Sequence, residues 1–260
     1  LYGPSNGYLN ASTIKIMKIV FSDFDGTLTV NGKLGAVFFE LLDIIEKNDS
    51  ELVIVSGRSL SWGHFLLTHF PLKHAIMEGG GVILTKNMDG VISEEFLVSD
   101  ADLEKLERTT IALQEEVPET VLSVDSFGRK SDRAIEFSLM KQTDVEKAES
   151  YLLKHKAHFS RSNVHVNFWF GDISKNYAVN YFLKNYTPHI NLEDTIFYGD
   201  SLNDESMFES FPNTVGVSNI ISVLDQLHHK PRIILEGKEN AGALGVLAHL
   251  KEVFDQSIDF

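Results

Sequence analysis

Residues 18–29 read KIVFSDFDGTLT, and this stretch decides the fold class. Its first half is a short, β-rich apolar run, which predicts a buried strand that stops at Asp23. Asp25 lies two residues further on, followed by Gly26 and Thr27, which suit a turn whose backbone amides face a ligand. Such a carboxylate pair can share a cation while one member attacks and the other moves protons. A solvated polar turn fits the pair alone equally well.

The same pattern, an apolar run that stops at polar residues, recurs along the chain. Further strands are predicted at residues 51–55, 75–77, 195–198, 213–217 and 232–234, and helices at 35–47, 61–70, 176–185, 204–209 and 220–227. Apolar strands that alternate with helices form parallel sheets covered on both faces. The sequence therefore predicts an α/β fold with a doubly wound, Rossmann-like parallel sheet and a site at the carboxyl ends of its strands.

Residues 99–170 follow a different order, which is typical of an α+β unit with an antiparallel sheet. A helix at 100–116 precedes strands at 121–126 and 133–139, and a helix at 144–155 precedes a strand at 164–170. We therefore expect an inserted α+β cap at 99–170 within a core made of 17–98 and 171–260. Residues 1–16 lack the features of a signal peptide, and we expect a leader that is foreign to the natural chain or weakly ordered.

Composition narrows the functional classes. The 260 residues carry a formal net charge of −14, which argues against a protein that coats nucleic acid but allows a small phosphorylated substrate held by local cations. The chain has no cysteine, which excludes disulfides, thiol catalysis and cysteine-based zinc sites. No apolar run reaches membrane-spanning length. We expect a cytoplasmic monomer or small homo-oligomer that acts on a small phosphorylated molecule and binds neither nucleic acid nor membrane.

Three further groups of polar residues lie where predicted strands end or a helix begins. Ser56-Gly57-Arg58 can hold phosphate oxygens with a hydroxyl and backbone amides, although in isolation it fits a plain helix N-cap better. Lys175 can neutralise a phosphate, but one lysine is weak evidence. The run GDSLND at 199–204 adds Asp200 and Asp204, whose oxygens suit Mg²⁺, while an acidic loop that caps a helix is the alternative.

Taken together, the four groups resemble the motifs of the haloacid-dehalogenase superfamily of phosphotransferases in order, spacing and strand-end position. The likeness covers the whole predicted core. The resemblance implies that Asp23 is a nucleophile that forms an aspartyl phosphate, with Asp25 as general acid and base. It also implies that the phosphoryl group is held by Ser56, Gly57, Lys175 and Asn203. These roles are coherent, because phosphoryl transfer needs a cation and oriented donors more than covalent machinery.

The resemblance further implies an Mg²⁺ cofactor. Its implied ligands are Asp23, Asp25 through the backbone carbonyl, Asp200, and Asp204 directly or through water. In one place the chain departs from the family. Many relatives have Glu-Asn-Gly after the third strand, whereas this chain has Glu78-Gly79-Gly80, so a role of that asparagine does not carry over.

The inserted unit resembles a compact type C2B cap. Such a cap is typical of subfamily IIB, which includes Cof-type, sucrose-phosphate, trehalose-phosphate and mannosyl-phosphoglycerate phosphatases. Alternation along 133–139 and 164–170 predicts an apolar face under two helices and a polar face turned to the core. The polar face would hold Glu136, Ser138, His165, Asn167 and Trp169. These groups suit a sugar, although an ordinary solvated sheet face fits them equally well.

Four cations are further candidates for contact with an anionic substrate. Arg58 belongs to the core, whereas Arg129 and Lys130 lie at a predicted hairpin tip, with Arg133 just after it. Each of the last three fits a tip kept soluble slightly better than a substrate contact.

The sequence therefore predicts a magnesium-dependent phosphatase that acts on a small phosphorylated metabolite, most simply a sugar phosphate. A phosphomutase of the phosphomannomutase type is the first alternative, because it shares the Asp-x-Asp-Gly-Thr-Leu-Thr opening. A phosphoacceptor domain without turnover is the second, although a built-in base at Asp25 would undermine stable phosphorylation.

Overall fold

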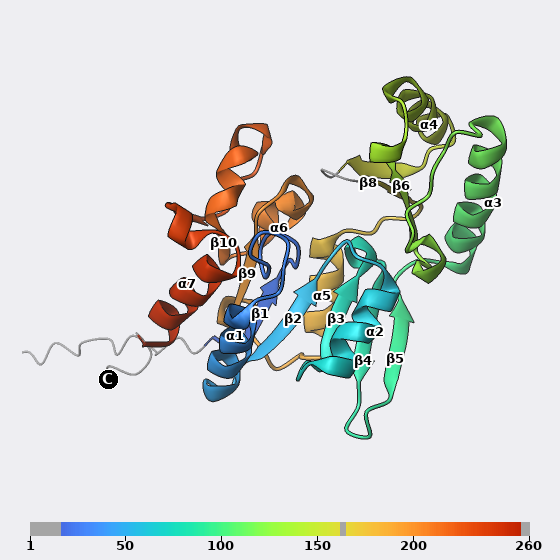
Figure 1. The fold of residues 1–260 in the computed structure, drawn as a ribbon. Coiled ribbons are helices and arrows are strands. Elements are labelled where there is room, and N and C mark those ends of the chain that lie inside the picture. The colour runs from blue at the N-terminus through green and yellow to red at the C-terminus, as the bar shows by residue number, and fades with distance from the viewer. Residues whose placement is uncertain (1–16, 162–164, 256–260) are drawn as a thin grey trace, which may run out of the picture.

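The computed structural model describes residues 17–161 and 165–255, so the interpretation of residues 1–16 as a leader falls outside the described residues. The main sheet has eight strands in the order β11-β10-β9-β1-β2-β3-β4-β5 (Figure 1). Their bounds are β1 Ile19–Ser22, β2 Glu51–Val55, β3 His74–Met77, β4 Val82–Lys86, β5 Ile92–Phe96, β9 Thr195–Gly199, β10 Thr214–Gly216 and β11 Ile233–Ile234. The pairs from β11 to β3 are parallel, and β4 and β5 add antiparallel strands at one edge.

Strand β1 lies at the centre of the sheet, and each of its residues is buried. Val20 packs on the face covered by α1 (Ala36–Lys47), α2 (Leu60–His69) and α7 (Ala243–Asp255). Phe21 packs on the opposite face, covered by α5 (Lys175–Asn185) and α6 (Glu205–Ser210), where its ring meets that of Phe182 edge to face at 5.9 Å. The sheet is therefore doubly wound, and its apolar strands are buried on both faces as the sequence predicts.

The order of strands along the chain reverses at β1, which places three strand ends side by side. β1 pairs with both β2 and β9, so that Ser22 is level with Ile54 on one side and Tyr198 on the other. The polar residues that follow these three strands therefore meet at one edge of the sheet. Ligands of open α/β sheets bind in the crevice at such a switch point.

A second sheet of three antiparallel strands lies between β5 and α5 in the chain, in the order β6-β8-β7. Its strands are β6 Asp132–Glu136, β7 His158–Arg161 and β8 His165–Trp169, and its helices are α3 Asp100–Glu116 and α4 Gln142–Lys154. Leu113 of α3, Leu152 of α4 and Phe168 of β8 are fully buried in one apolar cluster. Figure 1 shows both helices on the side of this sheet away from the main sheet.

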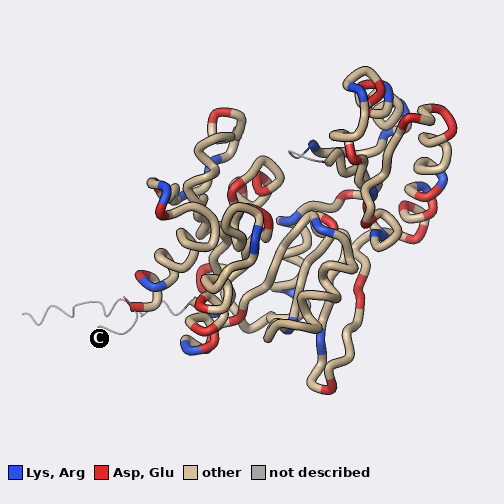
Figure 2. Tube along the Cα trace, in the orientation of Figure 1, with Lys and Arg blue, Asp and Glu red and all other residues tan. Residues whose placement is uncertain are grey.

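The described helices are short or amphipathic. The longest, α3, has 17 residues, and charged residues occur along its length (Figure 2). Within the described ranges, no helix is long and apolar enough to cross a membrane.

Several elements differ from their predictions. Residues 121–126 do not form a strand, since Leu122 makes only an isolated bridge to Ile135. β6 ends at Glu136, and the turn Phe137–Leu139 leaves Leu139 72% exposed instead of on the apolar face. The predicted helix at 220–227 is two short 3₁₀ turns. The strands β4 and β5 and the helix α7 go beyond the predicted elements.

Candidate active site

A buried ion pair between Asp23 and Lys175 lies at the carboxyl end of β1. Lys175 is the first residue of α5, and its Nζ lies 2.6 Å from Asp23 Oδ1 and 2.7 Å from Asp204 Oδ1. It also donates to Asn203 Oδ1 at 3.1 Å. Asp23, Lys175 and Asp204 are only 3%, 2% and 0% exposed. Charges this deeply buried are tolerated only when they are paired, so the structure has brought these residues together at one defined position.

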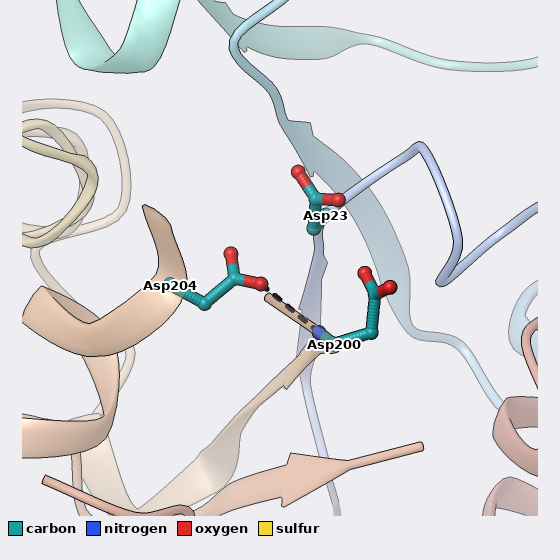
Figure 3. A group of neighbouring side chains, drawn as sticks. All are labelled: Asp23, Asp200 and Asp204. Atoms are coloured by element: carbon teal, nitrogen blue, oxygen red, sulfur yellow. Dashed lines mark hydrogen bonds between the residues drawn. The ribbon is translucent and has the colours of Figure 1, made fainter. Parts of the chain in front are cut away.

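Asp204 also fixes the loop that carries Asp200. Its Oδ2 accepts hydrogen bonds from the backbone nitrogens of Asp200 and Ser201 at 3.0 and 3.1 Å, the first of which is drawn in Figure 3. Both oxygens of Asp204 therefore have partners already. Because Asp204 is 0% exposed and one of its oxygens is paired with the Lys175 ammonium, it suits support through a water better than direct ligation.

The carboxylate of Asp200 is oriented by two residues from other segments. Thr27 Oγ1 donates to Asp200 Oδ1 at 2.8 Å, and Asn219 Nδ2 donates to Asp200 Oδ2 at 2.5 Å and to Gly26 O at 3.1 Å. Gly26 has a φ of +81°, and a Cβ on it would lie 2.2 Å from Asp200 Oδ2. Only glycine fits there, because any side chain would displace Asp200.

The carboxylates of Asp23, Asp200 and Asp204 converge, with one oxygen of each lying within 4.8 Å of the others (Figure 3). Burial, and then the charges of Asp23 and Asp204, raises the pKa of Asp200 to about 8. Burial also raises the pKa of Asp23, although Lys175 opposes this. Burial works against the charge of Lys175, but Asp204 and Asp23 outweigh it and hold the lysine pKa above its usual value. The single positive charge of Lys175 does not balance the three carboxylates. Their oxygens are the hard ligands that Mg²⁺ prefers, so the group fits this cation.

Asp25 is held by Arg58 through two hydrogen bonds. Arg58 Nε and Nη2 donate to the two Asp25 oxygens, both at 2.6 Å. The guanidinium also lies over the Trp62 ring, 4.0 Å from its centroid. The side chains of Asp25 and Arg58 are 49% and 30% exposed, so this pair is open to solvent, unlike Asp23 and Lys175. Both oxygens of Asp25 thus accept hydrogen bonds from Arg58 in this structure.

The loop after β2 lies beside these groups. Ser56 is 1% exposed and its Oγ accepts a hydrogen bond from Arg58 N at 3.2 Å. A Cβ on Gly57 would meet no atom within 4 Å, so there is room for a ligand on that side of the loop. Asn203 Oδ1 accepts from Ser201 Oγ at 2.9 Å as well as from Lys175.

One face of the cap sheet carries polar groups, as the sequence predicts for this alternation. Strand register places eight described residues on this open cap face: Asp132, Ala134, Glu136, His158, Ser160, His165, Asn167 and Trp169. His165 Nε2 lies 2.8 Å from Glu136 Oε2, and Asn167 Nδ2 donates to Asp132 Oδ2 at 2.8 Å. Trp169 stacks with His158 at an interplanar angle of 21°. Ser138 lies beyond β6 and donates to Glu136 Oε1 at 2.6 Å.

The prediction of an exposed hairpin tip at Arg129 is wrong. Arg129 is 4% exposed because its guanidinium is enclosed by Asp125 and Asp132, at 3.1 and 2.9 Å. Arg133 is level with Phe168 and therefore lies on the helix-covered face, opposite the open cap face. With Lys130, these arginines line a groove beside α3 whose acidic lining residues are Glu94, Asp100, Glu104 and Glu107.

Comparison with known proteins decides the family. The sequence model of the sucrose-6F-phosphate phosphohydrolase family matches residues 16–251. The chain belongs to this family. As a member of the sucrose-6F-phosphate phosphohydrolase family, it is a phosphatase of the haloacid-dehalogenase superfamily, subfamily IIB, as the four motifs and the cap indicate. A search of curated protein sequences finds no significant match.

Solved structures similar to this member of the sucrose-6F-phosphate phosphohydrolase family share its fold at low identity. Protein 0175 of Thermoplasma acidophilum is 17% identical, with a TM-score of 0.69, over 93% of this chain and 99% of that one. A haloalkanoate-superfamily phosphatase of Bacteroides thetaiotaomicron is 15% identical, with a TM-score of 0.68, over 97% and 100%. A trehalose-6-phosphate phosphatase related protein is 17% identical, with a TM-score of 0.62, over 92% and 99%.

The sequence reasoning assigned no role to two residues of this sucrose-6F-phosphate phosphohydrolase family member. Asn219 follows β10 and orients Asp200, while Glu78 follows β3 and is buried with its carboxylate fully bonded. Both lie at the same sheet edge as Asp23. The rule that found Asp23, polar residues directly after a buried parallel strand, also applies to Glu78, whereas Asn219 lies three residues beyond the end of β10.

Proposed function

We propose that this phosphatase uses Mg²⁺ to hydrolyse the phosphate monoester of a small sugar or polyol, through an aspartyl phosphate on Asp23. The main support is the position of Lys175 between Asp23 and Asp204, with Asp200 close by. A carboxylate that attacks a phosphoryl group needs nearby cations, because both partners are negatively charged. Lys175 pairs with Asp23 and Asp204 but not with Asp200, so the negative charge of the three carboxylates exceeds the one positive charge, which favours a divalent cation.

The chemistry would proceed in two steps. Asp23 attacks phosphorus, the bond from phosphorus to the sugar oxygen breaks, and Asp25 gives that oxygen its proton. Asp25 then takes a proton from a water molecule, which attacks the phosphorus of the aspartyl phosphate. This releases inorganic phosphate and restores Asp23. Before the first step Arg58 must release Asp25, and the incoming phosphate offers the guanidinium an alternative anionic partner.

The remaining groups would hold the phosphoryl oxygens and the cation. Lys175, the loop at Ser56 and Asn203 would bind and orient the phosphoryl group. Asp23, Asp200 and the Asp25 carbonyl would hold Mg²⁺, whose charge would offset that of the phosphoryl oxygens.

The open cap face supports a neutral leaving group. Its eight described residues are two carboxylates, two imidazoles, an amide, an indole, a serine and an alanine, with no lysine or arginine among them. Sugar hydroxyls can donate to Glu136 and exchange hydrogen bonds with Asn167, while the sugar ring can lie against Trp169. The names of the matching family and of the trehalose-6-phosphate phosphatase related protein point the same way.

The same face argues against the phosphomutase alternative. A mutase must hold a second phosphate away from the nucleophile, and that phosphate needs cations in the cap. Here Arg129 is already neutralised by Asp125 and Asp132, and Arg133 lies on the opposite face.

A phosphate-release screen tests the proposal. Sucrose 6F-phosphate, trehalose 6-phosphate, hexose phosphates, a hexose bisphosphate and 3-phosphoglycerate would be compared with added Mg²⁺ and with EDTA. We expect release from the neutral sugar phosphates with Mg²⁺ only, and acid-quenched protein labelled on Asp23. Asp23→Asn should lose activity and label, whereas Asp43→Asn, an exposed change on α1, should keep both.

Three results would contradict the proposal. Isomerised phosphosugar that depends on a bisphosphate activator would establish the mutase. Lasting phosphorylation of Asp23 without turnover of any phosphoester would establish the phosphoacceptor domain. Activity of Asp23→Asn close to that of the unchanged protein would refute the covalent mechanism.

A further inference from the structure

Glu78 is a buried carboxylate that the proposed reaction does not use. It is 1% exposed, and its φ of +55° lies in the left-handed region that residues other than glycine seldom adopt. Its Oε1 accepts from Leu60 N at 2.8 Å, at the start of α2 in the core. Its Oε2 accepts from both N and Oγ of Ser131 in the cap, each at 2.6 Å. Lys130 N adds a donor 3.1 Å from each oxygen. One carboxylate therefore joins the core to the cap.

Arg129 makes the reverse connection, from the cap to the core. Its guanidinium is enclosed by Asp125 and Asp132, and its Nη1 also donates to Gly57 O at 3.1 Å. Burial works against this charge, but the two carboxylates outweigh it and hold the arginine pKa above its usual value. Arg129 therefore stays charged, and it donates a hydrogen bond to the backbone of the loop that follows β2.

Both connections meet on the same loop, residues 56–60. Glu78 N donates to Arg58 O and Gly79 N donates to Ser56 O, both at 3.0 Å. The loop is thus held from the β3 side by backbone bonds, from its end by the Glu78 carboxylate, and from the cap by Arg129. The groups proposed to bind phosphate lie between these contacts.

We propose that Glu78 and Arg129 form a core–cap clamp, which positions the phosphate-binding loop 56–60 and fixes it to the cap loop 125–131. Neither residue touches the reacting atoms, so both are positioning residues. The role in catalysis rests on the proposed function, whereas the mechanical role does not.

Close packing surrounds the clamp. A Cβ on Gly81, in the core after β3, would lie 2.0 Å from Ser131 Oγ, and a Cβ on Gly128 would lie 2.6 Å from Ser61 Oγ in α2. The cap loop 125–131 is therefore in contact with the core on both sides of the clamp, without space between them.

Kinetics test the catalytic part. Arg129→Met removes the donor fork at similar length, and we expect kcat/KM to fall about 100-fold, since misplacement by about 1 Å has that effect. This loss should appear mainly as a higher KM and not as a lower kcat, because Asp23 and Asp25 are unchanged. Arg129→Lys keeps the charge and should recover part of the loss. Arg161→Met is the matched control, since Arg161 is an exposed cap arginine paired with Glu149 on the helix-covered face, and it should stay within about twofold.

A distance measurement tests the mechanical part without any substrate. The chain has no cysteine, so Glu40→Cys on α1 and Lys154→Cys on α4 would take two spin labels. We expect one narrow distance distribution, which both Arg129→Met and Ser131→Ala broaden and Arg161→Met leaves unchanged.

The outcomes separate the clamp from the proposed function. If the unchanged protein turns over no phosphoester while Arg129→Met and Ser131→Ala broaden the distance distribution, the proposed function is overturned and the clamp stands. Folded Arg129→Met and Ser131→Ala with unchanged distances and unchanged kcat/KM would overturn the clamp. Should Arg129→Met fail to fold, Ser131→Ala, which removes only one donor to Glu78, decides by the same two measurements.

Discussion

Replacing Gly26 by alanine should disable the proposed metal site with little effect on the rest of the fold. The new Cβ would lie 2.2 Å from Oδ2 and 2.8 Å from Cγ of Asp200. The carboxylate must therefore retreat by about 1 Å to reach an ordinary contact distance. That shift strains its hydrogen bonds from Asn219 and Thr27. A ligand misplaced by about 1 Å lowers activity about 100-fold, so we expect a loss of at least that order.

Backbone strain must be separated from this displacement, and Gly32 provides the control. Gly32 has a φ of +71°, close to the +81° of Gly26, but a Cβ on it would meet no atom within 4 Å. Alanine at either position should cost about 1–2 kcal/mol of stability through the left-handed backbone. Only Gly26→Ala should also weaken the site.

The assay is phosphate release as a function of Mg²⁺ concentration, beside urea unfolding of each variant. We expect Gly32→Ala to lose stability but to keep its activity and its Mg²⁺ requirement. Gly26→Ala should lose activity and need much more Mg²⁺. If Gly26→Ala and Gly32→Ala behave alike, the close approach of Gly26 to Asp200 has no functional meaning and the reasoning fails.

Three further predictions follow from the same geometry. Without Mg²⁺ the free energy of unfolding should fall as pH rises from about 4 to about 8, because the folded state binds the proton of Asp200 more tightly (pKa about 8, against 3.8). The slope should be at most about 1.4 kcal/mol per pH unit for each such group, and Mg²⁺ should abolish it. Urea unfolding at stepped pH measures the slope. A free energy of unfolding that rises with pH in EDTA would contradict the prediction. Asn219→Ala should raise the Mg²⁺ concentration for half-maximal activity about 10-fold to 100-fold, whereas Asn180→Ala on the exposed side of α5 should not change it; equal values would remove Asn219 from the site. Phe168→Ala should lower the free energy of unfolding by about 3–5 kcal/mol and loosen the cap core, while Phe127→Ala, at a side chain that is 91% exposed, should cost little. Thermal unfolding of both variants checks this. A small loss of stability in Phe168→Ala would count against a cap with its own core.

The positions of Asp23, Ser56 and Asp200 could be predicted from the sequence for a simple reason. Each follows a run of apolar, β-rich residues, and parallel strands that are neighbours in a sheet must end at the same edge. Local patterns therefore sufficed to bring residues together that lie far apart in the chain.

The environment of Arg129 could not be predicted in the same way. Its burial depends on Asp125 in its own loop, on Asp132 at the start of β6, and on Gly57, 72 residues away. No periodic pattern records such contacts, and an arginine in a polar connection fits an exposed position equally well. β5 was missed for a related reason: its sequence ISEEF is a partly exposed edge strand without the continuous apolar run of the buried strands.

Among the described residues, the cap joins the core through the linker 97–99, the linker 170–174 and the contact of residues 125–131 with loop 56–60 and Glu78. If the substrate is a sugar phosphate, as proposed, a sugar whose phosphate is bound in the core would meet the open cap face as part of the same molecule. Tethered partners of this kind experience effective concentrations in the millimolar range. Cap contacts too weak to retain a sugar from solution would then still select between sugars. The selectivity of the enzyme could accordingly change through single substitutions on Glu136, Asn167 or Trp169 without any change in the phosphate site.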